Sequence, residues 1–125
     1  MSDLHGLIVS HAAVAQALVA AVTAISGIEG VLTPVSNEGC GTDALAERLT
    51  QALGSGPAVL FVDLPGGSCF TTSLRLAKKN AAIAVVTGVN LAMLLDFVFH
   101  RDVAPDEAAR RAVDAGGKAI RVTAA

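Results

Sequence analysis

Two strand-to-helix turns in this sequence carry side chains that could handle a phosphoryl group. His11 stands where the apolar run at residues 7–9 gives way to an alanine-rich segment. Further along, Asp63 ends the apolar run at residues 58–62 and is followed by a glycine-rich segment. Because ligands of an open parallel α/β sheet bind at the carboxyl ends of its strands, we expect both turns to meet at one site.

His11 is the candidate nucleophile, and Asp63 is its candidate partner. A neutral imidazole nitrogen is nucleophilic near neutral pH, and the amino end of a helix would stabilise a phosphoryl group on it. Asp63 could accept a hydrogen bond from one ring nitrogen and leave the other free to attack. The alternatives are an ordinary capping or core histidine and a turn aspartate before Pro65. The matching of the two turns favours the functional interpretation.

The segment after Asp63 offers groups that could hold phosphate oxygens. Gly66 and Gly67 permit close approach of the backbone and its N–H donors, and Ser68 adds a hydroxyl. Ser10, directly before His11, can cap the first helix and is a further candidate phosphate ligand. The segment is not a P-loop, because no lysine follows it, and it is not a dinucleotide-binding fingerprint.

The remaining candidate residues have simpler interpretations. Asn90 is more plausible as a helix cap than as a link between loops, and Cys69 as a packed thiol than as a reactive one. His5 and His100 are expected to be structural or solvated. No set of His, Cys, Asp and Glu residues has the spacing of metal ligands, so we expect neither a metal nor a cofactor.

Composition limits the class of protein. At 125 residues and 12.6 kDa the chain fits one domain, residues 1–125, and its 53% hydrophobic content argues against disorder. A net charge of -2 and only 3% aromatic residues argue against nucleic-acid binding. Two cysteines without a signal peptide predict reduced thiols in the cytoplasm. The apolar stretch at 81–99 is interrupted by polar residues, which predicts a buried strand and helix without membrane insertion.

Short apolar runs alternate with longer helical patterns, which predicts a mainly parallel sheet with helices on both faces. The expected strands are 6–9, 31–35, 58–62 and 82–87, and the expected helices are 12–25, 43–53, 72–79, 91–100 and 105–115. Thr42 is expected to cap the second helix. Gly116-Gly117 should end the last helix, and the alternating segment 118–122 should form an edge strand.

Three blocks of the sequence, 7–11, 61–68 and 86–94, together resemble the mannose-type (mannose, fructose, sorbose) IIA domain of the bacterial phosphoenolpyruvate-dependent sugar phosphotransferase system. The blocks follow the order and spacing of that family over nearly the whole chain. The resemblance implies a phosphotransferase that accepts a phosphoryl group from the phosphocarrier protein HPr on His11. It would pass the group to a IIB component, for sugar uptake or for regulation.

The resemblance also assigns residues and an assembly. Asp63 would be the acid that pairs with the histidine, and Ser68 the serine of the glycine loop. The implied assembly is a homodimer that exchanges its C-terminal strand, which fits the edge-like segment 118–122.

The chain departs from the family at four positions. Ala12 stands where the family usually has glycine, Cys69 and Ala92 where it usually has proline, and Thr71 where it often has asparagine. The sugar and the partner proteins therefore stay open.

Other functions also stay open. One is the phosphodonor subunit of a dihydroxyacetone kinase, and another is a non-catalytic regulatory module derived from the family. A flavodoxin-like flavin protein is disfavoured, because the chain has no Trp or Tyr to stack on the flavin.

Overall fold

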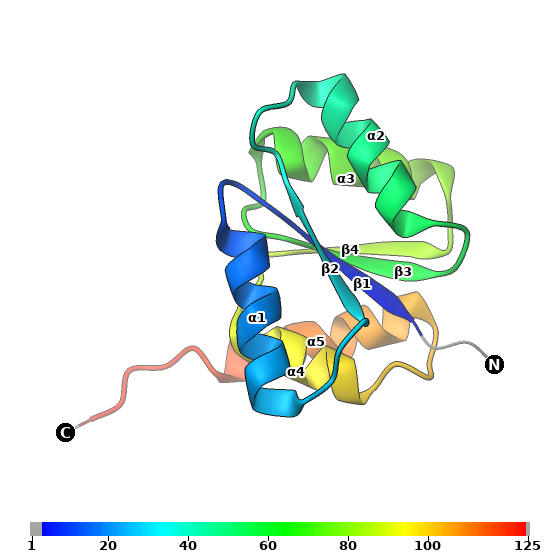
Figure 1. Cartoon of the computed structure of the whole chain (residues 1–125). Helices are drawn as coiled ribbons and strands as arrows, with labels where there is room; N and C mark the ends of the chain where they lie inside the picture. The colour runs from blue at the N-terminus through cyan, green and yellow to red at the C-terminus, as the bar shows by residue number, and fades with distance from the viewer. Residues whose placement is uncertain (1–3, 125) are drawn as a thin grey trace.

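Strands and helices alternate along the chain, as the sequence pattern predicts (Figure 1). The computed structural model describes residues 4–124. Within that range the elements are β1 His5–Ser10, α1 Val14–Ser26, β2 Leu32–Ser36, α2 Thr42–Leu53, β3 Ala58–Val62, α3 Gly67–Lys79, β4 Ile83–Thr87, α4 Leu91–Phe99 and α5 Pro105–Lys118.

The four strands form one parallel sheet in the order β2-β1-β3-β4. β1 and β3 are the inner strands and lie next to each other, with Val9 of β1 opposite Val62 of β3. The residues that follow these two strands, His11 and Asp63, therefore leave the sheet side by side at its carboxyl edge. The single-domain α/β fold with a parallel sheet is as predicted.

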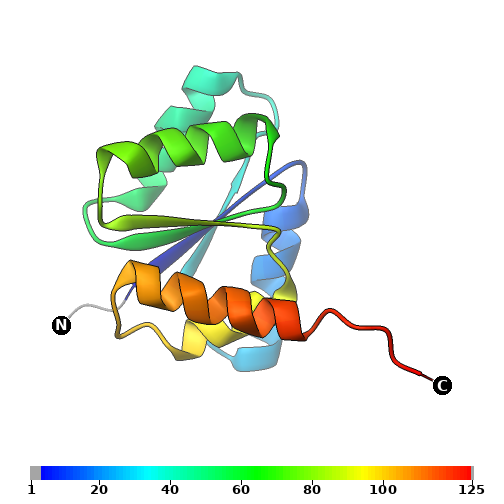
Figure 2. The same ribbon diagram turned by 180° about the vertical axis from the view of Figure 1, so that it is seen from behind.

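Helices cover both faces of the sheet. α1, α4 and α5 lie on one face, and α2 and α3 lie on the other (Figures 1 and 2). Each inner strand sends alternate side chains to the two layers: Ile8 and Phe61 pack with the first group of helices, and Leu7 and Leu60 with the second. Both inner strands are buried on both sides, which explains their unbroken apolar sequence.

Most predicted elements lie within two residues of the observed ones, and β3 has the predicted bounds. The predicted cap at Thr42 is wrong, because Thr42 is the first residue of α2 and Gly41 occupies the cap position. The apolar stretch at 81–99 folds into β4 and α4. In the part of the chain that the structure describes, no helix is long and apolar enough to cross a membrane.

α3 begins five residues earlier than predicted. Gly66 is extended at the cap position, and Gly67 opens the helix with a left-handed φ of 84°. Threonines and glycines are poor helix formers, but the first turns of α3 bury Cys69, Thr72 and Ser73 against the rest of the fold. Tertiary packing overrides local propensity here, so the glycine-rich segment forms the start of a helix.

The predicted end of the last helix at Gly116-Gly117 is wrong. α5 runs through Gly116 to Lys118, and residues 119–124 form no strand but extend away from the body (Figures 1 and 2). Gly116 stays helical because it lies against α4. A Cβ added at Gly116 would lie 2.9 Å from the Met93 methyl carbon. A segment with a strand pattern also needs a neighbouring strand, and residues 119–124 have none within the described chain.

Candidate functional site

The turn between β1 and α1 presents His11 at the carboxyl edge of the sheet. Ser10, the last residue of β1, is fully buried. Its hydroxyl accepts a hydrogen bond from the Ala15 N–H at 2.7 Å and donates to the His11 carbonyl at 3.1 Å. Ser10 thus satisfies an N–H at the start of α1, but the predicted cap position is wrong, because Ala13 is the N-cap residue. The Ser10 hydroxyl faces the interior of the turn and not the open side of the site. Ser10 therefore positions His11 through the backbone of the turn.

Ala12 gives this turn an unusual backbone. Its φ of 48° makes it the one non-glycine residue with a positive φ in the described chain. The left-handed region is unfavourable for a residue with a Cβ. The Ala12 carbonyl accepts a hydrogen bond from the Ser36 hydroxyl at 2.8 Å, which ties the turn to the end of β2. Hydrogen bonds from Ser10 to the His11 carbonyl and from Ser36 to the Ala12 carbonyl therefore hold the backbone at His11 in place.

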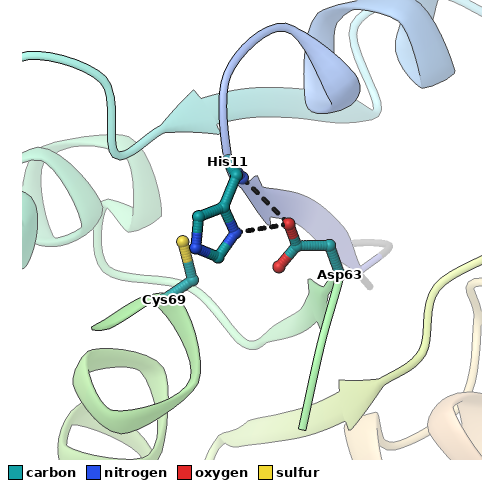
Figure 3. A group of neighbouring side chains, drawn as sticks. All are labelled: His11, Asp63 and Cys69. Carbon is teal, nitrogen blue, oxygen red and sulfur yellow. Dashed lines mark hydrogen bonds and ion pairs between the residues drawn. The ribbon is translucent and has the colours of Figure 1, made fainter. Parts of the chain in front are cut away.

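His11 and Asp63 form a tightly coupled pair (Figure 3). The Asp63 Oδ2 atom lies 2.7 Å from His11 Nδ1 and also accepts the His11 backbone N–H at 2.9 Å. The other carboxylate oxygen accepts the Leu64 N–H at 2.9 Å. The side chain of His11 is 45% exposed and that of Asp63 only 14%. The predicted hydrogen bond between the two is confirmed.

The electrostatics of Asp63 fix the protonation of this pair. Burial alone would raise the pKa of Asp63, but the hydrogen bonds from the His11 N–H, the His11 ring and the Leu64 N–H outweigh it, and the net effect lowers the pKa. Asp63 is then a carboxylate near neutral pH and can only accept hydrogen bonds. The proton of neutral His11 therefore lies on Nδ1, and Nε2 keeps a free lone pair.

The amino end of α3 lies beside this pair. Gly66 and Gly67 are exposed, and no side chain caps the helix. The first N–H groups of a helix lack intrahelical partners and carry the positive end of its dipole. Uncapped, they are suited to an anion. Ser68 is partly exposed in the first turn of the helix.

Asn37 is a neighbour that the sequence analysis missed. Its side-chain amide donates to the Ser68 hydroxyl at 3.4 Å, and its backbone N–H donates to the Ser10 carbonyl at 3.0 Å. Asn37 directly follows β2, so it reaches the same edge of the sheet as His11. A polar residue at the end of a predicted parallel strand was the signal that could have identified it.

Cys69 also belongs to this group. The sulfur is buried, and ligand atoms of Cys69, His11 and Asp63 all lie within 4.8 Å of one another. Burial, and then the charge of Asp63, raise the pKa of Cys69 to about 11, although the Ser68 side chain acts against this. Cys69 is a packed, protonated thiol, as predicted. The sequence spacing gave no indication of metal ligands, whereas the fold brings together three residues of metal-ligating types.

The other singled-out residues lie elsewhere. Asn90 caps α4, as predicted, by accepting the Met93 N–H at 3.0 Å, and its amide also donates to the Gly116 carbonyl of α5 at 3.1 Å. His5 begins β1 at the opposite end of the sheet. Burial and the charge of Arg101 lower the pKa of His5. His100 lies at the end of α4, with Nδ1 donating to the Asp96 carbonyl at 2.8 Å.

Comparison with known proteins assigns the chain to a family. The family model described as the fructose IIA component of the phosphotransferase system matches residues 6–113. The chain belongs to this family. Membership supports a general phosphotransferase role in the sugar phosphotransferase system and implies interaction with other components of that system. No curated protein matches the chain.

Solved structures of IIA proteins have the same fold. The EIIA component from Streptococcus agalactiae is 20% identical with a TM-score of 0.88, over 95% of this chain and 96% of that one. The mannose/sorbose-specific IIA subunit from Enterococcus faecalis is 21% identical with a TM-score of 0.84, over 99% and 97%. The IIA protein associated with the fucose utilization operon of Streptococcus pneumoniae is 18% identical with a TM-score of 0.69, over 97% and 96%. At these identities the similarity establishes the fold.

Proposed function

We propose that this IIA protein is a phosphohistidine carrier that accepts a phosphoryl group from HPr on His11 and passes it to a IIB component. One observation carries the proposal. A half-exposed histidine has one ring nitrogen held 2.7 Å from a carboxylate, beside the uncapped amino end of a helix. The free cysteines Cys40 and Cys69 are consistent with a cytoplasmic location.

In the proposed reaction, Nε2 of His11 is the nucleophile. Its lone pair attacks the phosphorus of the phosphohistidine on HPr, a new N–P bond forms, and the N–P bond to the donor imidazole breaks. The proton on Nδ1 stays in place. The ring becomes cationic, and the Asp63 carboxylate stabilises that charge. The N–H groups of Gly67 and Ser68 would hold the phosphoryl oxygens. Transfer to a IIB component reverses these steps with a new acceptor.

The surface around His11 supports transfer between proteins. His11 stands at the edge of the sheet with its ring 45% exposed. Two exposed apolar side chains lie close in sequence to the pair: Leu64, directly after Asp63, is 57% exposed, and Val14, three residues after His11, is 45% exposed. Exposed apolar side chains beside a reactive group suit a transient protein contact. We propose that these residues contact HPr and the IIB component.

The carrier role is tested by intact-mass analysis. The protein is incubated with phosphoenolpyruvate, enzyme I and HPr from the same organism, next to His11→Ala and His100→Ala. We expect one acid-labile phosphate on the wild type and on His100→Ala, because His100 lies away from the site, and none on His11→Ala. An unmodified wild type would refute the carrier role and favour a binding module. A phosphate on His11→Ala would place the acceptor elsewhere.

We also propose a homodimer in which residues 119–124 of each subunit join the sheet of the other. β4 is the outermost strand of the described sheet, so one of its edges lacks a strand partner there. Ile120 is 74% exposed and Val122 is fully exposed. An open groove of about 580 Å³ lies between β4 and α5. It is lined by Ala84, Val85 and Val86 of β4 and by Asp106, Ala109, Arg110, Val113 and Asp114 of α5. An apolar tail and an unpaired edge each need a partner.

Sedimentation analysis of the full chain and of a chain ending at Lys118 tests this assembly. We expect the full chain to sediment as a dimer and the shortened chain as a folded monomer, because the truncation removes the Ile120 N–H donor to the Gly117 carbonyl at the end of α5 but no buried core residue. The far-ultraviolet circular dichroism of both should agree. A monomeric full chain, or a shortened chain that stays dimeric, would refute strand exchange.

A further inference from the structure

A second kind of chemistry is available at the His11 site. A ring nitrogen of His11, a carboxylate oxygen of Asp63 and the sulfur of Cys69 lie within 4.8 Å of one another (Figure 3). These residues come from the ends of β1 and β3 and from the first turn of α3, so the fold holds them from three directions. Within residues 4–124 no other group of three such side chains is this close.

The three donor atoms match one class of cation. Imidazole nitrogen, carboxylate oxygen and thiolate sulfur are the ligands of Zn²⁺ and of similar transition metals, whereas Mg²⁺ and Ca²⁺ take oxygen ligands. Two ligands on a tetrahedral Zn²⁺, with bonds of about 2.0–2.3 Å, are about 3.3–3.8 Å apart. The three ligand atoms, which now lie within 4.8 Å of one another, would have to move only slightly closer together to reach that spacing, and side-chain rotations can supply the movement.

The charges in the cluster also favour a cation. Asp63 brings a carboxylate and Cys69 a sulfur to the same cluster. A carboxylate and a thiolate this close would repel each other strongly in a partly buried site. A divalent cation between them would replace that repulsion by attraction and would leave the group of metal, carboxylate and thiolate neutral.

We propose that His11, Asp63 and Cys69 form a binding site for a divalent cation of the Zn²⁺ type, and that the bound cation prevents phosphorylation of His11. Binding forms a bond from the metal to the Cys69 sulfur and releases the thiol proton to solvent. The 2.7 Å hydrogen bond between His11 Nδ1 and Asp63 opens because the metal binds both atoms, and the proton that Nδ1 carried moves to Nε2. A water molecule fills the fourth position.

The consequence for the carrier follows from the shared atoms. With the metal on Nδ1 and the proton on Nε2, neither ring nitrogen of His11 has a lone pair that can attack phosphorus. The metal also withdraws the Asp63 carboxylate that would stabilise the charged ring. The cation and the phosphoryl group therefore compete for the same histidine. This second part rests on the proposed carrier function, whereas the binding site itself does not.

Titration of the purified full chain with Co²⁺ tests the site without any phosphorylation. Tetrahedral Co²⁺ has intense visible bands, and a bound thiolate adds a charge-transfer band in the near ultraviolet. We expect one Co²⁺ per chain with both signals, and their displacement by Zn²⁺. Cys40→Ser is the matched control, because Cys40 is the other free cysteine and lies outside the cluster, and it should keep both signals.

Two variants should weaken the site. Cys69→Ser should lose the charge-transfer band and bind Co²⁺ at least about ten-fold more weakly. His11→Ala should bind more weakly to a similar extent, and since His11 is half exposed this variant keeps its fold even if the buried Cys69 does not tolerate serine. A wild type that binds no Co²⁺ at micromolar concentrations would refute the site. So would a charge-transfer band that depends on Cys40, or binding that His11→Ala leaves unchanged.

The competition is tested separately by the rate of phosphorylation from HPr with and without Zn²⁺. Each variant is compared with its own metal-free rate, and phosphorylation of HPr by enzyme I is monitored as a control for effects on the donors. We expect Zn²⁺ to slow the wild type and Cys40→Ser more than Cys69→Ser. Equal slowing of all three would refute the competition. A chain that shows the Co²⁺ signals but is never phosphorylated would refute the carrier role and leave the metal site standing.

Discussion

The turns after β1 and β3 leave adjacent strands at the same edge of the sheet, yet they are built differently. The first, from His11 to Val14, is closed on itself: the buried Ser10 hydroxyl satisfies the Ala15 N–H, and Ala12 takes a left-handed backbone. The second, from Asp63 to Gly67, is open. Its helix has no side-chain cap, and its glycines are exposed.

This difference divides the work of the proposed site. A nucleophile must be held at one place and angle, and the closed turn does that for His11. A phosphoryl group needs free N–H donors, and the open turn leaves those of α3 available. Asp63 links the two turns, because one of its oxygens accepts both the ring and the backbone of His11.

The largest effect is expected from breaking the link. Asp63→Asn keeps the shape of the side chain but removes the charge that stabilises a cationic ring. We expect phosphorylation by HPr to slow by about a hundred-fold or more, measured as the rate of phosphate incorporation. Thermal unfolding shows whether the variant is folded. A rate within about three-fold of the wild type would mean that Asp63 does not assist the reaction.

The backbone of the open turn can be tested at two neighbouring glycines. Gly67 has a φ of 84° and Gly66 one of −163°, and an added Cβ has no neighbour within 4 Å at either position. Gly67→Ala should lower the free energy of unfolding by about 1–2 kcal/mol, because only it forces a Cβ into the left-handed region. Gly66→Ala, the matched control, should change it by less than about 0.5 kcal/mol. Urea denaturation measures both, and equal effects would contradict a role for backbone strain.

The two serines should behave in opposite ways. Ser10→Ala leaves the Ala15 N–H without its buried acceptor and should cost about 1–2 kcal/mol of stability. Ser68→Ala removes a partly exposed hydroxyl and should cost less than about 0.5 kcal/mol, while slowing phosphorylation more than the thermal data explain. Denaturation and phosphate incorporation, measured on both variants, separate the roles. A stable Ser10→Ala protein would show that the first turn is not closed by this hydroxyl.

The smallest effect is expected at Ala12. Glycine would relieve the left-handed strain at a φ of 48°, but it also makes the unfolded chain more flexible. Relief of the strain should stabilise the protein by about 1–2 kcal/mol, and the more flexible unfolded chain should cost about 0.5–1 kcal/mol. Ala12→Gly should therefore stabilise the protein by about 0.5 kcal/mol. Differential scanning calorimetry would detect this as a small rise in Tm. A fall in Tm would show that the methyl group of Ala12 contributes packing that outweighs the strain.

The sequence by itself determined the sheet and the meeting of the two turns. The short, unbroken apolar runs indicated strands buried on both sides, and the alternation with helices indicated a parallel sheet. Parallel strands end at a common edge, so His11 and Asp63 could be paired from the order of elements and the family pattern. Their 2.7 Å contact follows from β1 and β3 being neighbours.

Tertiary structure decided the rest, because those features depend on residues far apart in the chain. α3 starts at Gly67 because its first turns are buried against the fold, whatever their propensity. α5 continues through Gly116 because a residue without a Cβ fits against Met93. Segment 118–122 has the pattern of a strand, but a pattern forms a strand only where a neighbour offers hydrogen bonds. Cys69 joins His11 and Asp63 because three elements converge, and spacing along the sequence carries no trace of that convergence.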